Sequence, residues 1–455
     1  MPGRLEIGAS WRAQGAPRRA LQGAGSTQRL LLLADFSGRA SRSAHDAAGL
    51  RGRRPVAVDF ERLASVMQTM MPRVALSAGT LQINTLEDFH PDRLIASLPG
   101  LGALEQARHL PPAAPLAAPP AAPPGTEDDN TTINRLLGRP ASTPAPAATG
   151  IDALLRQVVA PHVVAAVPTA QPHHTAALAE QLRAVLADPG LQAVEAAWRG
   201  VEWLLSRLEL DDGLELHLLD CTRQELAADL VAAAGQPSAT GLLHALTLNH
   251  RPDDEPPWLA LIGLFDFDSS TLDLALLAAL GSIGRECGAP FIGGAGPALT
   301  HAALQDRVAA GWQMLCASDV APWLALAGPR LLMRAPYGRG GEAVETLAFE
   351  EVIDGANTHD LLWAPGSLFC ALAVGQAVSV NPLDPLNPGR FEVDGLPALL
   401  TGEQGVLCAE QRLDDNQAEA LQNHGLVALR GHRGRHSVLL QTLHSVAGWG
   451  HPLGE

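Results

Sequence analysis

The sequence predicts an α/β fold (α+β in its smaller part), built as two modules with a linker between them. Strand-like and helix-like patterns alternate between residues 214 and 296, which favours a parallel sheet covered by helices. A shorter set of strands and helices occupies residues 28–110. A segment rich in Pro and Ala, residues 111–150, separates the two sets.

The composition is that of a globular protein with an acidic balance. The chain has 455 residues, of which 47% are hydrophobic, and a formal net charge of −16. A chain of this length can bury a substantial core. An acidic balance disfavours general nucleic-acid binding, because that function needs a basic surface to displace counterions from phosphates.

Cysteine usage and hydropathy predict a cytoplasmic location. The five cysteines are odd in number, widely spaced and never arranged as Cys-x-x-Cys, which favours free, reduced thiols. No apolar run of about 18 residues is free of charge, Pro or Gly, so we expect no membrane insertion. The N-terminus is basic but has no apolar core of the kind that secretory signals carry.

The smaller module, residues 28–110, begins with "RLLLLADF", whose length and flanking turn predict a buried strand. A second strand, a helix, a third strand and a helix interrupted at 99–100 follow. The first strand stops at the acidic turn "DFSG". Such a turn can open a catalytic loop, or it can position a strand in a larger assembly.

Residues 111–150 consist mainly of Pro, Ala, Gly and Thr. A stretch of this composition cannot bury enough apolar surface to fold, and its Pro residues favour extended polyproline II conformations. We therefore predict a disordered linker at 111–150. We also expect residues 1–27 to form a flexible N-terminus.

The larger module, residues 151–455, opens with a helical region over 151–205 that has a Pro-Gly break at 189–190. The pattern strand, helix, strand, helix, strand follows and predicts the parallel sheet. Thr222 and Glu225 fit a capping box at the first of these helices, because the side chain of each residue can accept a hydrogen bond from the backbone N–H of the other.

The second helix of this pattern begins after Ser269 or Ser270, either of which can cap it. Residues 320–455 predict several short strands and one helix, "NQAEALQNHG", which ends at the glycine Gly425. The larger module is therefore expected to be α/β in its first part and richer in strands and loops in its second part.

Two carboxylates, Asp266 and Asp268, end the strand "LFDFD". Two residues apart on a strand, they point to the same side and could bind Mg²⁺ or act as an acid and base pair. We favour the alternative that they satisfy free N–H groups at the start of a helix. His432 and His436 have the spacing of metal ligands but no third ligand nearby. We predict no catalytic residue, metal or cofactor.

Residues 29–108 resemble the small subunit of the contractile sheath of bacterial type VI secretion systems. The resemblance lies in "RLLLLADFSGR", "VAVDFERLASVMQTMMPRVAL" and "LEDFHPDRLIASLPGLGALEQAR". Residues 151–445 resemble the large subunit of the same sheath. The helix that contains Glu195, Trp198, Arg199 and Gly200 carries this second resemblance, together with "CGAPFIGGAGPAL", "PRLLMRAPYG" and "FEVDGLPALL".

The resemblance implies a non-enzymatic, sheath-like structural or assembly component of a type VI secretion system. Its implied partners are sheath or baseplate subunits, with self-association as a further possibility. The large subunit continues past the point where this chain stops, so a part that interlocks neighbouring subunits is expected to be missing. The alternatives are an accessory or baseplate adaptor that does not polymerise and, less favoured, a metal-assisted enzyme that uses Asp266 and Asp268.

The resemblance also assigns roles to single residues. It makes Asp35, Phe36 and Gly38 part of a turn that positions the first strand, not of a catalytic loop. It places Trp198 in a core, pairs Arg199 with a buried carboxylate and makes Gly200 structural. We expect Arg330, Arg334, Tyr337 and Gly338 to lie either at an interface or among the internal supports of a packed loop.

Overall fold

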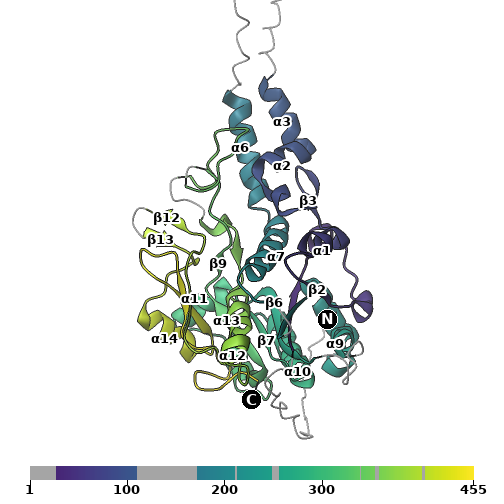
Figure 1. Ribbon diagram of the computed structural model, residues 1–455, viewed down its shortest axis with the longest axis vertical. Helices are drawn as coiled ribbons and strands as arrows, with labels where there is room; N and C mark the ends of the chain where they lie inside the picture. The colour runs from purple at the N-terminus through teal and green to yellow at the C-terminus, as the bar shows by residue number, and fades with distance from the viewer. Residues whose placement is uncertain are drawn as a thin grey trace, which may run out of the picture. The chain divides into compact units, whose positions relative to one another are not determined.

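The computed structural model describes residues 27–109, 172–210, 213–247, 256–338, 340–353, 358–401 and 405–454 (Figure 1). The predicted linker at 111–150 and almost all of the predicted flexible N-terminus lie outside the described residues. Described residues up to Leu101 and from Ala179 onward belong to one compact unit. The residues between them belong to a second unit, in which the end of helix α3 and the start of helix α6 are described.

The larger unit is built on a nine-stranded sheet. From one edge to the other its strands are β11 Phe391–Val393, β15 Val438–Leu440, β14 Val427–Gly431, β8 Leu324–Gly328, β7 Phe291–Ala295, β6 Trp258–Phe267, β1 Gln28–Ala34, β5 Leu214–Asp220 and β2 Val56–Val58. The strands from β14 to β5 run parallel, whereas β15, β11 and β2 add in antiparallel orientation at the edges. The predicted parallel sheet is confirmed.

Strand β1 lies in the interior of this sheet, between β5 and β6. Leu31 pairs with His217 of β5 on one side and with Leu261 of β6 on the other. All seven residues of β1 are buried. Strands that are covered on both faces read as continuous apolar runs, which explains the four consecutive leucines. The two modules that the sequence suggests thus share one sheet and one core.

Helices cover both faces of the sheet. The described helices are α1 Leu63–Met70, α2 Pro91–Ser97, α3 Pro99–His109, α6 Pro172–Leu186, α7 Pro189–Leu205, α8 Arg223–Ala232, α9 Gly241–Thr247, α10 Thr271–Cys287, α11 Pro297–Leu304, α12 Ala310–Cys316, α13 Ser367–Val380 and α14 Asp415–Asn423. Helix α10, next to α8, α9 and α12, packs on the face formed by Leu31 and Leu33. Helices α13 and α7 lie on the opposite side of β1 and β6.

Three short pairs of antiparallel strands lie outside the nine-stranded sheet in the described part of the chain. They are β3 Arg73–Leu76 with β4 Gly79–Gln82, β9 Leu331–Leu332 with β10 Trp363–Ala364, and β12 Leu399–Thr401 with β13 Gly405–Leu407. Among the described residues, no helix combines the length and the apolar character needed to cross a bilayer.

Local sequence signals set the ends of several helices. The capping box of Thr222 and Glu225 is present at the start of α8. Ser270, not Ser269, caps α10 by accepting the backbone N–H of Asp273. Gly425 has a φ of 76° just after α14, a conformation that glycine adopts without strain.

The expectation of one helix after residue 320 was wrong, because α13 lies there as well. Its sequence "SLFCALAVGQAVSV" has hardly any polar face, and most of its residues are buried. A helix that is apolar on all sides gives no helical periodicity, so the pattern could not reveal it. The hairpin strand β3 was also missed, since the sequence suggested only one strand between α1 and α2.

Candidate functional site

The turn after β1 is held by its own polar groups. The Asp35 carboxylate accepts the backbone N–H groups of Arg39 and Ala40, both at 2.8 Å. The side chain is buried, and burial raises the pKa of Asp35 although these two hydrogen bonds act against the rise. Because its oxygens are engaged by the backbone of the next turn, Asp35 positions the chain that follows β1.

Phe36 and Trp198 join this turn to helix α7. The Trp198 indole Nε1–H donates to the Phe36 carbonyl oxygen at 2.9 Å, and the two rings meet edge to face with centroids 5.2 Å apart. Both side chains are fully buried. Gly38 has a φ of 70°, and a Cβ there would lie 2.3 Å from the carbonyl oxygen of Arg73. Only glycine fits this approach.

Four charged residues at the carboxyl ends of β1 and β5 form one ion cluster, here called the Glu225 cluster: Arg39, Arg53, Asp220 and Glu225. Arg39 donates to the two carboxylate oxygens of Glu225, each at 3.0 Å. Arg53 donates to the same oxygens at 2.6 and 2.8 Å. Arg39 also pairs with Asp220. The Glu225 side chain is fully buried, so both guanidinium groups compensate a charge that water does not reach.

Burial by itself would raise the pKa of the Glu225 carboxyl. The hydrogen bonds from Arg53 and Arg39, with those from the backbone of Thr222 and Asp46, outweigh burial and hold this pKa well below its usual range. Glu225 therefore stays ionised and fixes both arginines. The sequence marked Glu225 only as a helix cap and did not single out Arg39 or Arg53, although the basic residues directly after the "DFSG" turn were a visible signal.

A second ion cluster, here called the Glu195 cluster, contains Glu195, Arg199, Arg334, Tyr337 and Glu351. Arg334 donates to Glu195 at 3.0 Å and to both oxygens of Glu351 at 2.7 and 3.0 Å. Arg199 donates to Glu195 at 2.7 Å and to the Tyr337 hydroxyl at 3.4 Å. The Arg334 guanidinium lies over the Tyr337 ring, 4.0 Å from its centroid.

The Glu195 cluster is interior to the chain. Arg334 is 8% and Tyr337 1% exposed, and Glu195 is fully buried. Burial lowers the pKa of Arg334, but Glu195 and Glu351 outweigh that effect and raise it above its usual value. Burial raises the pKa of the Tyr337 hydroxyl. These surroundings are those of an internal support, one of the two roles that the sequence left open for Arg334 and Tyr337.

Two glycines let elements approach one another around this cluster. A Cβ at Gly200 would lie 3.1 Å from a side-chain carbon of Leu368, so this glycine allows α7 to pack closely on α13. Gly338 has a φ of 125°, and a Cβ there would lie 2.3 Å from a carboxylate oxygen of Glu350. Both positions serve packing within the chain.

Arg330 lies outside the Glu195 cluster and has a different ion-pair partner. It forms a two-pronged ion pair with Glu410, with distances of 2.8 and 2.6 Å. Its side chain is 22% exposed. Asp266 lies near it, with 4.0 Å between Arg330 Nη1 and Asp266 Oδ2. Arg330 is thus the most accessible of the four residues that were predicted to lie at an interface or in an internal support.

The structure separates the tasks of Asp266 and Asp268. The Asp268 carboxylate accepts the backbone N–H of Leu299, in the first turn of α11, at 2.8 Å. Asp268 therefore satisfies a free N–H group at a helix start, as the sequence favoured, but the helix is α11 and not α10. The Asp266 Oδ1 is enclosed without a hydrogen bond, and burial raises the pKa of this carboxyl to about 7. In the part of the chain that the structure describes, no group of three or more His, Cys, Asp or Glu side chains could hold a metal ion.

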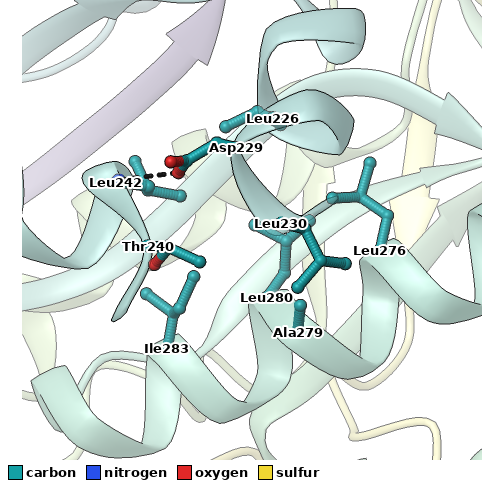
Figure 2. A pocket seen from close by; sticks show the side chains of 9 residues that line it. All are labelled: Leu226, Asp229, Leu230, Thr240, Leu242, Leu276, Ala279, Leu280 and Ile283. Carbon is teal, nitrogen blue, oxygen red and sulfur yellow. Dashed lines mark hydrogen bonds between the residues drawn. The ribbon is translucent and has the colours of Figure 1, made fainter. Parts of the chain in front are cut away.

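Figure 2 shows a small pocket between α8, the start of α9 and α10. Its lining is mostly leucine. The Asp229 carboxylate accepts the backbone N–H groups of Gly241 and Leu242 at 2.7 and 3.0 Å, and the Thr240 hydroxyl donates to the Pro237 carbonyl at 2.6 Å. Asp229 therefore helps to start α9, Thr240 closes the turn before it, and the pocket is a gap in helix packing.

Comparison with known proteins agrees with this arrangement. Residues 27–111 match the family described as type VI secretion system, VipA, VC_A0107 or Hcp2. Residues 174–447 match the family VipB, described as EvpB/VC_A0108, tail sheath N-terminal domain. The chain is also 27% identical, over 283 residues, to the type VI secretion system sheath protein TssC1 of Pseudomonas aeruginosa.

The match to TssC1 covers 56% of this chain and 56% of the relative, so this chain spans about half the length of that curated protein. The VipB match, by contrast, takes in more than half of the 455 residues. The two matched segments meet in one sheet, where β1 of the first lies between β5 and β6 of the second. The chain therefore belongs to the VipB family of type VI secretion tail sheath proteins and carries a VipA-like segment at its N-terminal side.

Proposed function

We propose that this chain is a structural or assembly component of a bacterial type VI secretion sheath and that it works through protein–protein interfaces in the cytoplasm, without catalysis. One observation carries the proposal. The VipA-like strand β1 completes the VipB-like sheet, with β5 and β6 on its two sides. Parts that resemble two sheath subunits thus form a single folded protomer.

The charged residues of the protomer also support a structural role. The Glu225 cluster and the Glu195 cluster each tie distant segments of the chain together. Asp268 starts a helix, and Arg330 is paired with Glu410. In the part of the chain that the structure describes, the charged groups of both clusters, Asp268 and Arg330 are thus engaged by contacts within the fold.

The edges of the sheet are suitable places for contacts with other sheath or baseplate subunits. Strand β2 lies at one edge and β11 at the other, and each is bonded to one neighbour in the sheet. Val56 of β2 is 37% exposed, and nearby in sequence Phe60 is 66% exposed. Edge strands can add a strand from another chain through main-chain hydrogen bonds.

The proposal is tested by expressing the tagged chain together with sheath subunits of a type VI system. We expect sheath subunits to co-purify with it and negative-stain microscopy to find it within or at the end of sheath-like tubes. Recovery of no sheath or baseplate protein would contradict the proposal. Binding to sheath subunits without entry into tubes would favour the alternative of an adaptor that does not polymerise.

The second alternative, a metal-assisted enzyme that uses Asp266 and Asp268, is tested by a separate measurement. Thermal stabilisation of the chain by Mg²⁺ or ATP, lost in Asp268→Asn, would favour an enzyme. We expect no such shift, because Asp268 is already engaged by the backbone of α11.

A further inference from the structure

We propose that residues 27–101 keep the strand position between β5 and β6 closed, so that this chain excludes a separate small sheath subunit. The inference rests on the proposed function in one respect, since the excluded partner is a sheath subunit. It concerns which partner the chain can accept, not whether the chain enters a sheath. Sheath proteins that do bind would then have to use surfaces other than this position.

The pairing of β1 is the first argument. Residues 28–34 pair with residues 214–220 of β5, and residues 29–33 pair with β6. Adjacent strands lie about 4.8 Å apart, so β5 and β6 are separated by the width of one strand. Since β1 fills that width and both of its edges are hydrogen-bonded, no second strand can enter.

The Glu225 cluster is the second argument. Arg39 and Arg53 come from the VipA-like segment, whereas Asp220 and Glu225 come from the VipB-like segment. Releasing the first segment would leave the fully buried Glu225 without both of its guanidinium partners. Removing one partner of a buried ion pair is strongly unfavourable, because the other charge is left without compensation, so the cluster holds β1 in place.

A third contact holds the far end of the VipA-like segment. Asp92, in the first turn of α2, accepts the backbone N–H groups of Glu345 and Thr346 at 3.0 and 2.9 Å. Burial would raise the pKa of Asp92, but the hydrogen bonds from Thr346 and Glu345 outweigh it and lower the pKa. The segment is therefore fixed at β1 and again about 60 residues later.

The first experiment asks whether the segment stays in place without a covalent connection. A site for a sequence-specific protease is inserted between residues 110 and 171 of the full chain, and the cut protein is passed over a sizing column. We expect the two pieces to elute together. Separation of the wild-type pieces at physiological salt would overturn the proposal.

A matched pair of variants makes this experiment specific. Glu225→Gln keeps the shape of the side chain but removes its charge, and we expect it to weaken the association of the cut pieces by roughly tenfold or more. Glu419→Gln, at an exposed position of α14, should leave the association unchanged. Equal behaviour of both variants would show that the Glu225 cluster does not hold the segment.

The second experiment offers the excluded partner directly. A tagged small sheath subunit of a type VI system is incubated with the cut protein, and we expect it not to displace the N-terminal piece from the rest of the chain. Release of the N-terminal piece, with the small subunit bound in its place, would overturn the proposal. If the chain fails to enter sheath tubes while the cut pieces stay together, the proposed function fails and this inference stands.

Discussion

Arg39 donates two hydrogen bonds, each of 3.0 Å, to the two carboxylate oxygens of Glu225, although 186 residues separate them in the sequence. The geometry is that of a two-pronged arginine–carboxylate pair, which fixes direction as well as distance. Because Glu225 is fully buried, the pair joins the end of β1 to the start of α8 where water cannot replace it. The pair therefore couples the folding of the VipA-like and VipB-like segments.

We expect Glu225→Gln to lower the free energy of unfolding by about 3 to 5 kcal/mol, because it removes a fully buried charge and leaves two partly buried guanidinium groups without their common counter-charge. Chemical denaturation followed by far-UV circular dichroism measures the change. Glu419→Gln is the matched control, since Glu419 is an exposed glutamate on a helix. A loss below about 1 kcal/mol, the range of exposed ion pairs, would mean that water reaches the cluster.

Arg334→Ala is expected to lower the melting temperature, because it removes the cation that Glu195 and Glu351 share in the interior. A loss on the order of 3 to 5 kcal/mol is typical when one partner of a buried pair is removed. Arg433→Ala, at an exposed position, serves as the control. An unchanged melting temperature with weaker co-purification of sheath subunits would instead make Arg334 an interface residue.

Gly38→Ala is expected to destabilise the chain more than Gly389→Ala. Both glycines adopt the left-handed backbone conformation, with φ angles of 70° and 67°. A Cβ at position 389 meets nothing within 4 Å, so only the conformational cost of about 1 to 2 kcal/mol remains there. At position 38 the Cβ would collide with the Arg73 carbonyl oxygen. Equal melting temperatures for the two variants would refute the close approach.

Asp266→Asn is expected to stabilise the chain at pH 8 but not near pH 4. Burial raises the pKa of Asp266 from 3.8 to about 7, so between these values the unfolded state loses its proton before the folded state does. Ionisation thus costs stability as pH rises through this window, by on the order of 4 kcal/mol once pH exceeds 7. Asparagine removes that cost because it does not ionise.

Thermal melts of Asp266→Asn and of the wild type at several pH values measure this difference. Asp394→Asn is the matched control, because Asp394 is exposed. A gain that is the same at pH 4 and pH 8 would show that the effect comes from packing and not from the charge of Asp266.

The strands of the sheet were the part most readily predicted, and β1 shows why. Its four leucines form a continuous apolar run, which is the mark of a strand covered on both faces. Helix starts followed equally local rules, as Thr222 and Ser270 illustrate. Helix α13 escaped prediction because it is apolar on all sides, and a periodicity cannot be detected where every position is alike.

The candidate site was predicted only in part. The sequence, through its resemblance to sheath subunits, singled out Trp198, Arg199 and Arg334, and these residues lie at the junctions between segments. It did not name Arg39, Arg53 or Glu351. Each of these acts through a partner that the chain brings near only by folding.

The sequence by itself determined most of the elements, their order and the resemblance to sheath subunits, because periodicity, caps and motifs are properties of neighbouring residues. Only the tertiary structure decided that β1 lies between β5 and β6 and that Arg39 meets Glu225. The physical reason is that strand order and ion pairing depend on which distant surfaces bury one another. The contribution of a charged side chain to stability likewise depends on whether the folded chain excludes water from it.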